Sequence, residues 1–313
     1  MAPDGSMNLE EEVRRGYTIP AEMKKVWKVQ MDLLRKLLSV CDKHHLKVWA
    51  EGGTLLGTVR DHGYIPWDDD IDMAMLREDY DELVRIAPEE FGRPYFFQCG
   101  YTEKAYSRGH AQLRMDGTSA INPAKAFLDT HQGIFIDIFP FDAVPDDEDA
   151  KKALIRKRNK QEVFLQHLAV NDPLHPLRTL GMMFLRPFYP RFFGRFEKLL
   201  RSNPLKDNRH VACLGFTDDL EHFERDKEWY SGTLYMPFED ISMPVPSGYD
   251  EILKKQYGDY LVPRQAPTFH GGFWKLDPET PYESYLPELR AYSKTMEKDH
   301  LKSRISRLLN RFK

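Results

Sequence analysis

The sequence is poor in cysteine and has no long apolar run. Its three cysteines lie far apart at positions 41, 99 and 213, without CxxC pairs or the cysteine–histidine spacing of a structural zinc site. We therefore expect reduced, buried thiols. No window reaches the roughly 18 apolar residues that a membrane span needs, and the first residues lack the basic start and apolar stretch of a signal peptide. These absences favour a cytoplasmic protein.

The chain as a whole also lacks an excess of charge of either sign. It has 45 Lys and Arg against 49 Asp and Glu, a formal net charge of -4, which argues against a protein devoted to nucleic acid. Residues 151–201 nevertheless carry twelve basic and three acidic residues, and residues 294–313 carry seven and two. Both segments could lie on an anionic membrane surface, as a peripheral contact on its inner face. The alternatives are a helical lid for the first and a solvated or disordered end for the second.

Hydrophobic periodicity predicts an α/β (α+β) fold, with a mixed sheet flanked by helices. Helical spacing covers residues 21–45 and 79–87, and β-prone runs cover residues 46–50, 70–75, 94–99, 111–115 and 133–139. Two further helical stretches, 149–169 and 177–200, predict a helical insertion. The predicted divisions are an N-terminal extension 1–20, a catalytic core 21–145, a basic helical insertion 146–228, a return of the core 229–275 and a basic tail 276–313.

An acidic run, Trp67-Asp-Asp-Asp-Ile-Asp72, carries the strongest chemical signal. Residues two apart on a strand point to the same face, about 6.5–7 Å apart, so Asp70 and Asp72 are expected to project together. Two carboxylates at that spacing can share a divalent cation that binds phosphate oxygens. By the same alternation, we expect Asp68 at the nucleotide side and Asp69 pointing away, where it should be replaceable.

Two other interpretations of this run were weighed. A solvated charge cluster would not need the neighbouring Ile65, Trp67 and Ile71. A calcium-binding EF-hand loop would require glycine at its sixth position and glutamate at its twelfth, where this sequence has Met73 and Asp79. A cation site for phosphate chemistry remains the favoured interpretation.

Two further features fit a phosphate site. Asp137 lies within the apolar run 134–139, where an unpaired charge would be costly, so we expect a metal or proton-accepting role, with a buried structural carboxylate as the alternative. Gly52, Gly53 and Thr54 form a turn whose N–H groups could hold a phosphate, or that is merely structural. The segment is not a P-loop, because Gly57 is not followed by Lys and then Ser or Thr.

Together these motifs resemble the LicD family of bacterial phosphocholine transferases, which is related to the fukutin-related proteins. The resemblance rests on residues 51–60 (EGGTLLGTVR), 63–72 (GYIPWDDDID) and 133–142 (GIFIDIFPFD), with Met243-Pro-Val-Pro246 and Tyr257-Gly-Asp-Tyr260 later in the chain. It implies a nucleotidyltransferase fold, dependence on Mg²⁺ or Mn²⁺, and metal binding at Asp70 and Asp72. It also implies transfer of a phospho-alcohol from a CDP-linked donor, CDP-choline first, to a hydroxyl of a cell-surface glycan or its lipid-linked precursor.

On this interpretation Asp137 accepts the proton of the acceptor hydroxyl, and Arg60 and Arg114 clamp the phosphates. A surface ion pair is the alternative for Arg114. Two other functions stay open: a nucleotidyltransferase that uses an NTP and releases pyrophosphate, and a non-catalytic, membrane-associated binding protein with an inactive core.

Overall fold

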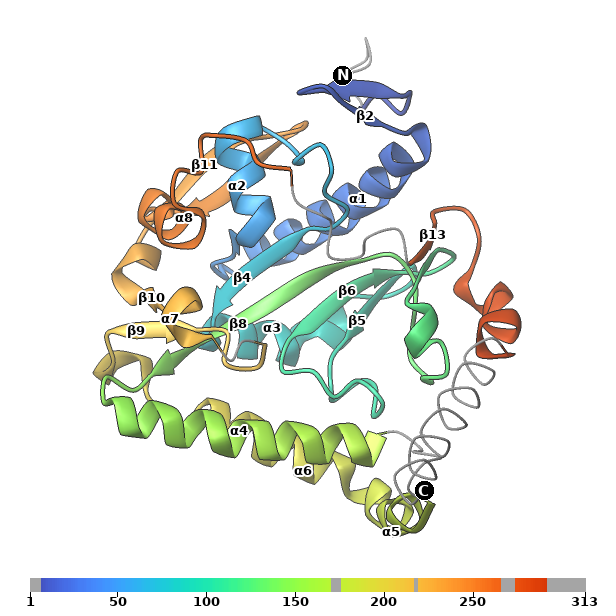
Figure 1. The fold of residues 1–313 in the computed structure, drawn as a ribbon, viewed down its shortest axis with the longest axis vertical. Helices are drawn as coiled ribbons and strands as arrows, with labels where there is room; N and C mark the ends of the chain where they lie inside the picture. Colours follow the sequence, from blue (N-terminus) through green and yellow to red (C-terminus); the bar gives the residue numbers. More distant parts are fainter. Residues whose placement is uncertain (1–6, 170–175, 217–218, 266–273, 292–313) are drawn as a thin grey trace, which may run out of the picture.

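The computed structural model describes residues 7–169, 176–216, 219–265 and 274–291 (Figure 1). Its centre is a seven-stranded sheet. The strands of this sheet are β3 (Trp49–Ala50), β4 (Asp72–Leu76), β5 (Tyr95–Gln98), β6 (Ala111–Met115), β8 (Phe135–Val144), β9 (His210–Ala212) and β10 (Arg225–Asp226). The long strand β8 pairs in parallel with β4 and antiparallel with β6 and β9. The mixed sheet predicted from the sequence is confirmed.

Three small two-stranded sheets surround the main one. They are formed by β1 (Glu12–Arg14) with β2 (Tyr17–Ile19), β7 (Ser119–Ile121) with β13 (Lys275–Asp277), and β11 (Thr233–Phe238) with β12 (Ile241–Pro246). The strands β1, β2, β7 and β13 were not expected from the sequence, whereas β11 and β12 lie in the predicted return of the core. The N-terminal segment therefore forms a hairpin before the first helix.

The two faces of β8 differ in chemistry. Ile136 and Ile138 are fully buried in the apolar core. The alternate residues Phe135, Asp137 and Phe139 line a large cavity instead. Helices α1 (Ala21–Lys43) and α3 (Arg77–Glu90) lie behind the sheet in Figure 1. Strand alternation thus separates a packed side from a side that can receive a ligand.

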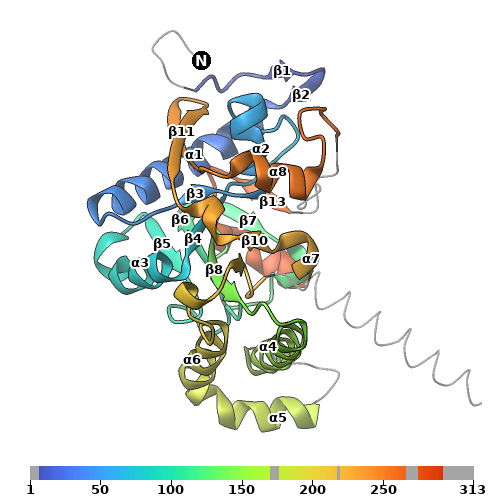
Figure 2. The ribbon, with the colours of Figure 1, turned by 90° about the vertical axis from the view of Figure 1, so that its left-hand side faces the viewer.

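The insertion is helical, as predicted, but it is divided differently. Its helices are α4 (Glu148–Ala169), α5 (Pro176–Leu185) and α6 (Tyr189–Leu200), which gather at one end of the molecule (Figure 2). The continuous helix expected over 177–200 is wrong, because a 3₁₀ turn at Arg186–Phe188 separates α5 from α6, at prolines 187 and 190. The same region also supplies β9 and β10, and the short helix α7 (Leu220–Phe223).

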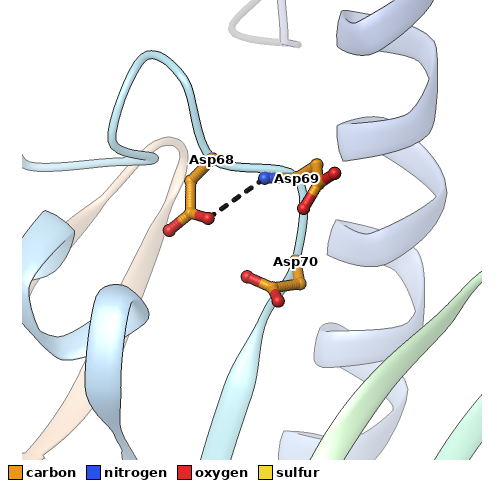
Figure 3. A group of neighbouring side chains, drawn as sticks. All are labelled: Asp68, Asp69 and Asp70. Carbon is orange, nitrogen blue, oxygen red and sulfur yellow. Dashed lines mark hydrogen bonds between the residues drawn. The ribbon is translucent and has the colours of Figure 1, made fainter. Parts of the chain in front are cut away.

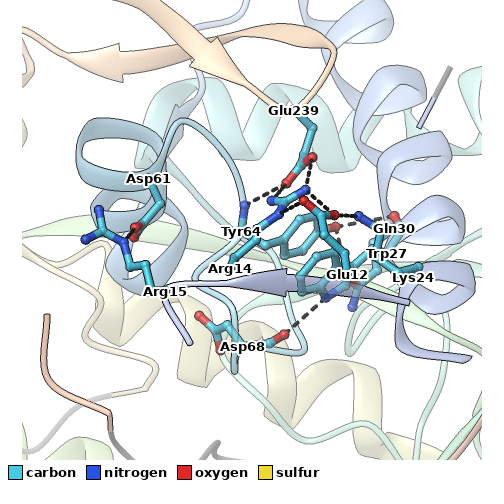
Figure 4. Close-up of polar contacts among 10 residues, drawn as sticks. All are labelled: Glu12, Arg14, Arg15, Lys24, Trp27, Gln30, Asp61, Tyr64, Asp68 and Glu239. Atoms are coloured by element: carbon cyan, nitrogen blue, oxygen red, sulfur yellow. Dashed lines mark hydrogen bonds and ion pairs between the residues drawn. The ribbon is translucent and has the colours of Figure 1, made fainter. Parts of the chain in front are cut away.

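The N-terminal hairpin is fastened to distant parts of the chain by charged groups (Figure 4). Arg14 donates to Glu239 at 2.5 and 3.0 Å and to Glu12 at 2.8 and 3.1 Å. Lys24 of α1 donates to Glu12 at 2.5 Å. Arg15 pairs with Asp61, at the end of α2 (Gly52–Asp61). The hairpin therefore ties α1, α2 and the β11–β12 turn together.

Two further expectations can be checked here. All three cysteines are free and buried, as predicted. Among the described residues, no helix has both the length and the apolarity to cross a membrane. The basic tail predicted at 294–313 lies outside the described residues.

Candidate active site

A single cavity brings most of the predicted site residues together. Its volume is about 1150 Å³, and it lies against the ligand-receiving side of β8. The predicted residues that line it are Gly52, Gly53, Arg60, Asp68, Asp70, Asp72, Arg114 and Asp137. Thr54 does not line it, because its Oγ1 accepts a hydrogen bond from the backbone N–H of Asp72 at 2.9 Å. Thr54 holds the strand that carries the carboxylates, whereas the sequence analysis expected it to contact a phosphate.

The acidic loop is held by helix α1. Trp27 Nε1 donates to the carbonyl oxygen of Asp68 at 3.1 Å, and Gln30 Nε2 donates to that of Asp69 at 2.8 Å. Tyr64 stacks on Trp27 at 4.3 Å between ring centroids, and its hydroxyl donates to Gln30 Oε1 at 3.1 Å. Because these donors fix the backbone carbonyls, the carboxylates of the loop are presented in a set arrangement (Figures 3 and 4).

The loop geometry corrects the strand alternation assumed around Asp69. Strand β4 begins at Asp72, so the alternation assumed for residues 68–71 does not apply. One carboxylate oxygen of each of Asp68, Asp69 and Asp70 lies within 4.8 Å of the others (Figure 3). Asp69 thus lies close to its neighbours, but it is buried and outside the cavity, in agreement with the expectation that it points away from the site.

The parallel pairing of β4 with β8 adds two more carboxylates. Asp72 and Asp137 are register partners in adjacent strands, so their side chains leave the sheet on the same face. Burial and the nearby Asp72 raise the pKa of Asp70 well above its usual value. Burial and the nearby Asp137 raise the pKa of Asp72 in the same way. So many carboxylates in a buried space repel one another, and a divalent cation would relieve that repulsion.

Asp137 has a different environment. Gln112 Nε2 donates to its Oδ1 at 2.7 Å, and His110 Nε2 lies 3.1 Å from the same oxygen. Burial opposes the charged form, but His110, Arg108 and Gln112 outweigh it, so the pKa of Asp137 lies below its usual value. Burial lowers the pKa of His110, which favours a neutral ring. Asp137 is thus kept as an anion.

The glycine pair at the start of α2 lies directly against the carboxylates. A Cβ on Gly53 would come 2.6 Å from Asp68 Oδ2, and one on Gly52 would come 3.3 Å from Asp72 Oδ2. Gly52 also has a φ of +55°, which disfavours other residues. The start of α2 therefore packs against the carboxylates in a way that a side chain at either glycine would disturb. The donor set consists of hard oxygen ligands, which fits Mg²⁺ or Mn²⁺.

The two arginines expected to clamp phosphate already have protein partners. Arg60 Nε donates to Asp61 at 2.9 Å. Arg114 donates to Gln98 Oε1 at 2.5 Å, to Gln112 Oε1 at 2.5 Å and to the Gly133 carbonyl at 2.6 Å. Arg114 is buried, so it is not part of a surface ion pair, and its bonds to protein groups mean that it is not free to bind a phosphate. Its contacts orient Gln112, which in turn holds Asp137.

Several cavity residues were missed by the sequence analysis. They are Glu51, Arg108 and His110. Gln112, which was also missed, does not line the cavity but donates to Asp137, which does. Glu51 is buried, with its carboxylate 3.6 Å from Arg225 and 3.5 Å from the Tyr230 hydroxyl. Two signals could have found some of them: Glu51 directly precedes the glycine pair, and Gln112 is two residues from Arg114, on the same strand face.

Comparisons with known proteins agree with the family that the sequence motifs resemble. Residues 45–188 match the model described as LicD/FKTN/FKRP, nucleotidyltransferase domain. Lipopolysaccharide cholinephosphotransferase LicD of Haemophilus influenzae is 25% identical over 240 residues, covering 74% of this chain and 89% of that protein. An uncharacterised protein of Rickettsia prowazekii is 41% identical over 78 residues, 24% of this chain and 27% of that protein. Ribitol 5-phosphate transferase FKRP of Homo sapiens is 34% identical over 58 residues, 18% of this chain and 12% of that protein. The resemblance to the LicD family expected from the sequence is therefore confirmed, for the domain that residues 45–188 form.

Proposed function

We propose that this protein is a phosphotransferase that modifies a cell-surface glycan or its lipid-linked precursor. It moves phosphocholine, or a related phospho-alcohol, from a CDP-linked donor to a hydroxyl and releases CMP. The observation that carries this proposal is the gathering of Asp68, Asp70, Asp72 and Asp137 in one cavity, beside the start of α2. The names of two relatives, a cholinephosphotransferase and a ribitol 5-phosphate transferase, support the reaction class.

Asp70, Asp72 and Asp137 are the residues proposed to hold the divalent cation, with Asp68 beside them. When bound, Mg²⁺ or Mn²⁺ would neutralise charge on phosphate oxygens and favour in-line displacement. The protein's own part is to fix these carboxylates. Helix α1 holds the loop carbonyls, Thr54 holds the N–H of Asp72, and Gln112 holds Asp137.

The proton-accepting role predicted for Asp137 is less well supported than its role as a ligand. A general base works best when its pKa lies near the working pH, whereas the surroundings of Asp137 hold its pKa below the usual value. A carboxylate kept charged in this way is well suited to bind a cation. The N–H groups at the start of α2, beside these carboxylates, could also hold a phosphate oxygen.

The proposal predicts release of CMP from a CDP-alcohol in the presence of Mg²⁺. A panel of CDP-choline, CDP-ethanolamine, CDP-glycerol and CDP-ribitol should be offered with glycan acceptors, and CMP measured by chromatography. Asp72→Asn should lower turnover by at least about a hundredfold while the far-ultraviolet circular dichroism stays unchanged. Asp42→Asn, an exposed site at the far end of α1, is the matched control and should keep full activity.

The same assay separates the alternatives. Pyrophosphate released from CTP would favour a nucleotidyltransferase. Absence of any Mg²⁺-dependent nucleotide binding in calorimetry would favour a non-catalytic binding protein. Full turnover in Asp72→Asn would contradict the metal assignment.

A further inference from the structure

With Arg60 and Arg114 engaged by protein groups, the cavity still contains cationic side chains on other elements. Arg108 lies in the segment before β6, and Lys125 ends the 3₁₀ turn Pro123–Lys125. Both line the same cavity as the carboxylates. Neither residue belongs to the motifs that the sequence analysis singled out.

The Arg108 guanidinium is half-buried and lies 5.8 Å from the centroid of the Tyr106 ring. Across residues 7–169, 176–216, 219–265 and 274–291, no hydrogen-bond or ion-pair partner is found for this side chain. Its charge acts on Asp137 and lowers the pKa of that carboxylate, yet the two groups form no ion pair. A half-buried guanidinium without a partner is costly, and its five N–H donors suit a phosphate.

Lys125 adds a second positive charge to the same part of the cavity. Within the described chain, its ammonium group likewise has no hydrogen-bond or ion-pair partner. Lys125 is exposed at the cavity wall, where loss of hydration and the nearby Arg108 charge lower its pKa, so the two cations are close enough to disfavour each other. Two cations on one part of the cavity wall, neither of them held in an ion pair within the described chain, can together bind an anion.

We propose that Arg108 and Lys125 form an anion subsite that binds a phosphate group of the substrate, in the cavity that the carboxylates also line. The identity of that phosphate rests on the proposed function. It is either part of the diphosphate of the CDP-linked donor or a phosphate carried by the acceptor. Two cations there would bind oxygens that the carboxylate side does not reach, and would offset negative charge that grows during transfer.

The test is calorimetric titration of Arg108→Gln and Lys125→Gln, in the full-length protein with Mg²⁺, using inorganic pyrophosphate and CDP as separate probes. Each variant should bind pyrophosphate about tenfold more weakly than the wild type, because a charge-assisted phosphate contact is lost. Lys104→Gln is the matched control: it removes an exposed charge from the same segment, outside the cavity, and should bind as the wild type does. Thermal melts confirm that the variants are folded.

The two probes distinguish the sources. Weaker binding of both pyrophosphate and CDP supports a donor subsite, and weaker binding of pyrophosphate alone supports an acceptor subsite. Unchanged pyrophosphate binding in both variants would overturn the proposal. If pyrophosphate binding depends on these residues but no CDP-alcohol is consumed, the subsite stands and the proposed reaction fails.

Discussion

At the scale of single residues, the acidic loop shows how neutral groups make a charged site possible. The side chains of Trp27 and Gln30 hold the carbonyls of Asp68 and Asp69, and Thr54 holds the N–H of Asp72. None of these three donors or acceptors carries charge. They position carboxylates that would otherwise move apart under their mutual repulsion.

Substitution of two glycines of α2 should separate an effect on activity from an effect on stability. A methyl group at Gly53 would meet the end of a side chain, Asp68 Oδ2, at 2.6 Å, whereas one at Gly57 would meet the backbone oxygen of Gly63 at 2.4 Å. Gly53→Ala should displace the carboxylate and lower turnover by tenfold or more, with little change in unfolding free energy. Gly57→Ala should instead destabilise the fold by about 1–3 kcal/mol, because backbone must shift.

Urea denaturation and the CMP assay on both variants check this pair. Equal losses of stability in the two variants would show that the contact at Gly53 is structural.

At the scale of elements, the helical insertion contributes both to the cavity wall and to the outer surface of the molecule. Helix α4 places Glu162 and Gln166 on the cavity wall, so it encloses the site as the lid interpretation expects. Helix α5 faces outward at the end of the molecule (Figure 2). The exposed apolar residues of α5 and the turn after it are Leu180, Met183, Phe184 and Phe188. Exposed basic residues of α6, Arg191 and Arg195, lie nearby in the chain.

This combination predicts contact with an anionic membrane surface, where apolar side chains insert and arginines meet the headgroups. The double variant Phe184→Ser, Phe188→Ser should cosediment with phosphatidylglycerol vesicles at least about tenfold more weakly than the wild type, given the apolar area removed. Tyr235→Ser, at an exposed aromatic on β11, is the control and should bind as the wild type does. Equal cosedimentation of all three proteins would end the membrane proposal.

At the scale of the whole molecule, the N-terminal hairpin joins segments far apart in the chain. The Arg14 contact with Glu239 brings the start of the chain to the β11–β12 turn, while Glu12 receives donors from Arg14 and Lys24. Hydrogen bonds from Arg14, and then from Lys24, lower the pKa of Glu12 to about 2 against partial burial. The charged form of Glu12 therefore belongs to the folded state.

A carboxylate whose pKa is lowered on folding contributes stability above its unfolded pKa, and that contribution disappears as it becomes protonated in the folded state. The stability advantage of the wild type over Glu12→Gln should thus be constant above about pH 4.5 and vanish as the pH falls toward 2. Because Glu12 is only half-buried and solvent screens its contacts, the advantage should be about 1 kcal/mol or less. Urea denaturation at a series of pH values measures it.

The exposed neighbour Glu11 provides the control. Glu11→Gln should show no such pH-dependent difference from the wild type. An advantage of Glu12 that persists unchanged at pH 2 would contradict the assignment of its contacts.

The sequence by itself determined the local elements, the fold class and the family. Periodicity placed α1 and the strands β5 and β6 nearly at their observed bounds, because side-chain spacing reports which face of an element is buried. The spacing of Gly52, Gly53 and the acidic run identified the site, because these residues are neighbours in the chain. Strand alternation was assumed too early in the chain, because β4 begins only at Asp72, although Asp69 lies outside the cavity as expected.

Only the tertiary structure decided which groups face one another. The parallel register of β4 and β8 places Asp72 beside Asp137. The packing of β5 and β6 occupies Arg114 with Gln98 and Gln112, whereas Arg108 is left facing the cavity. The partners of a charged side chain come from segments distant in the sequence, and the free energy of its burial depends on those partners. Local spacing carries no information about them, so the sequence alone could not separate arginines already bound from those able to bind a ligand.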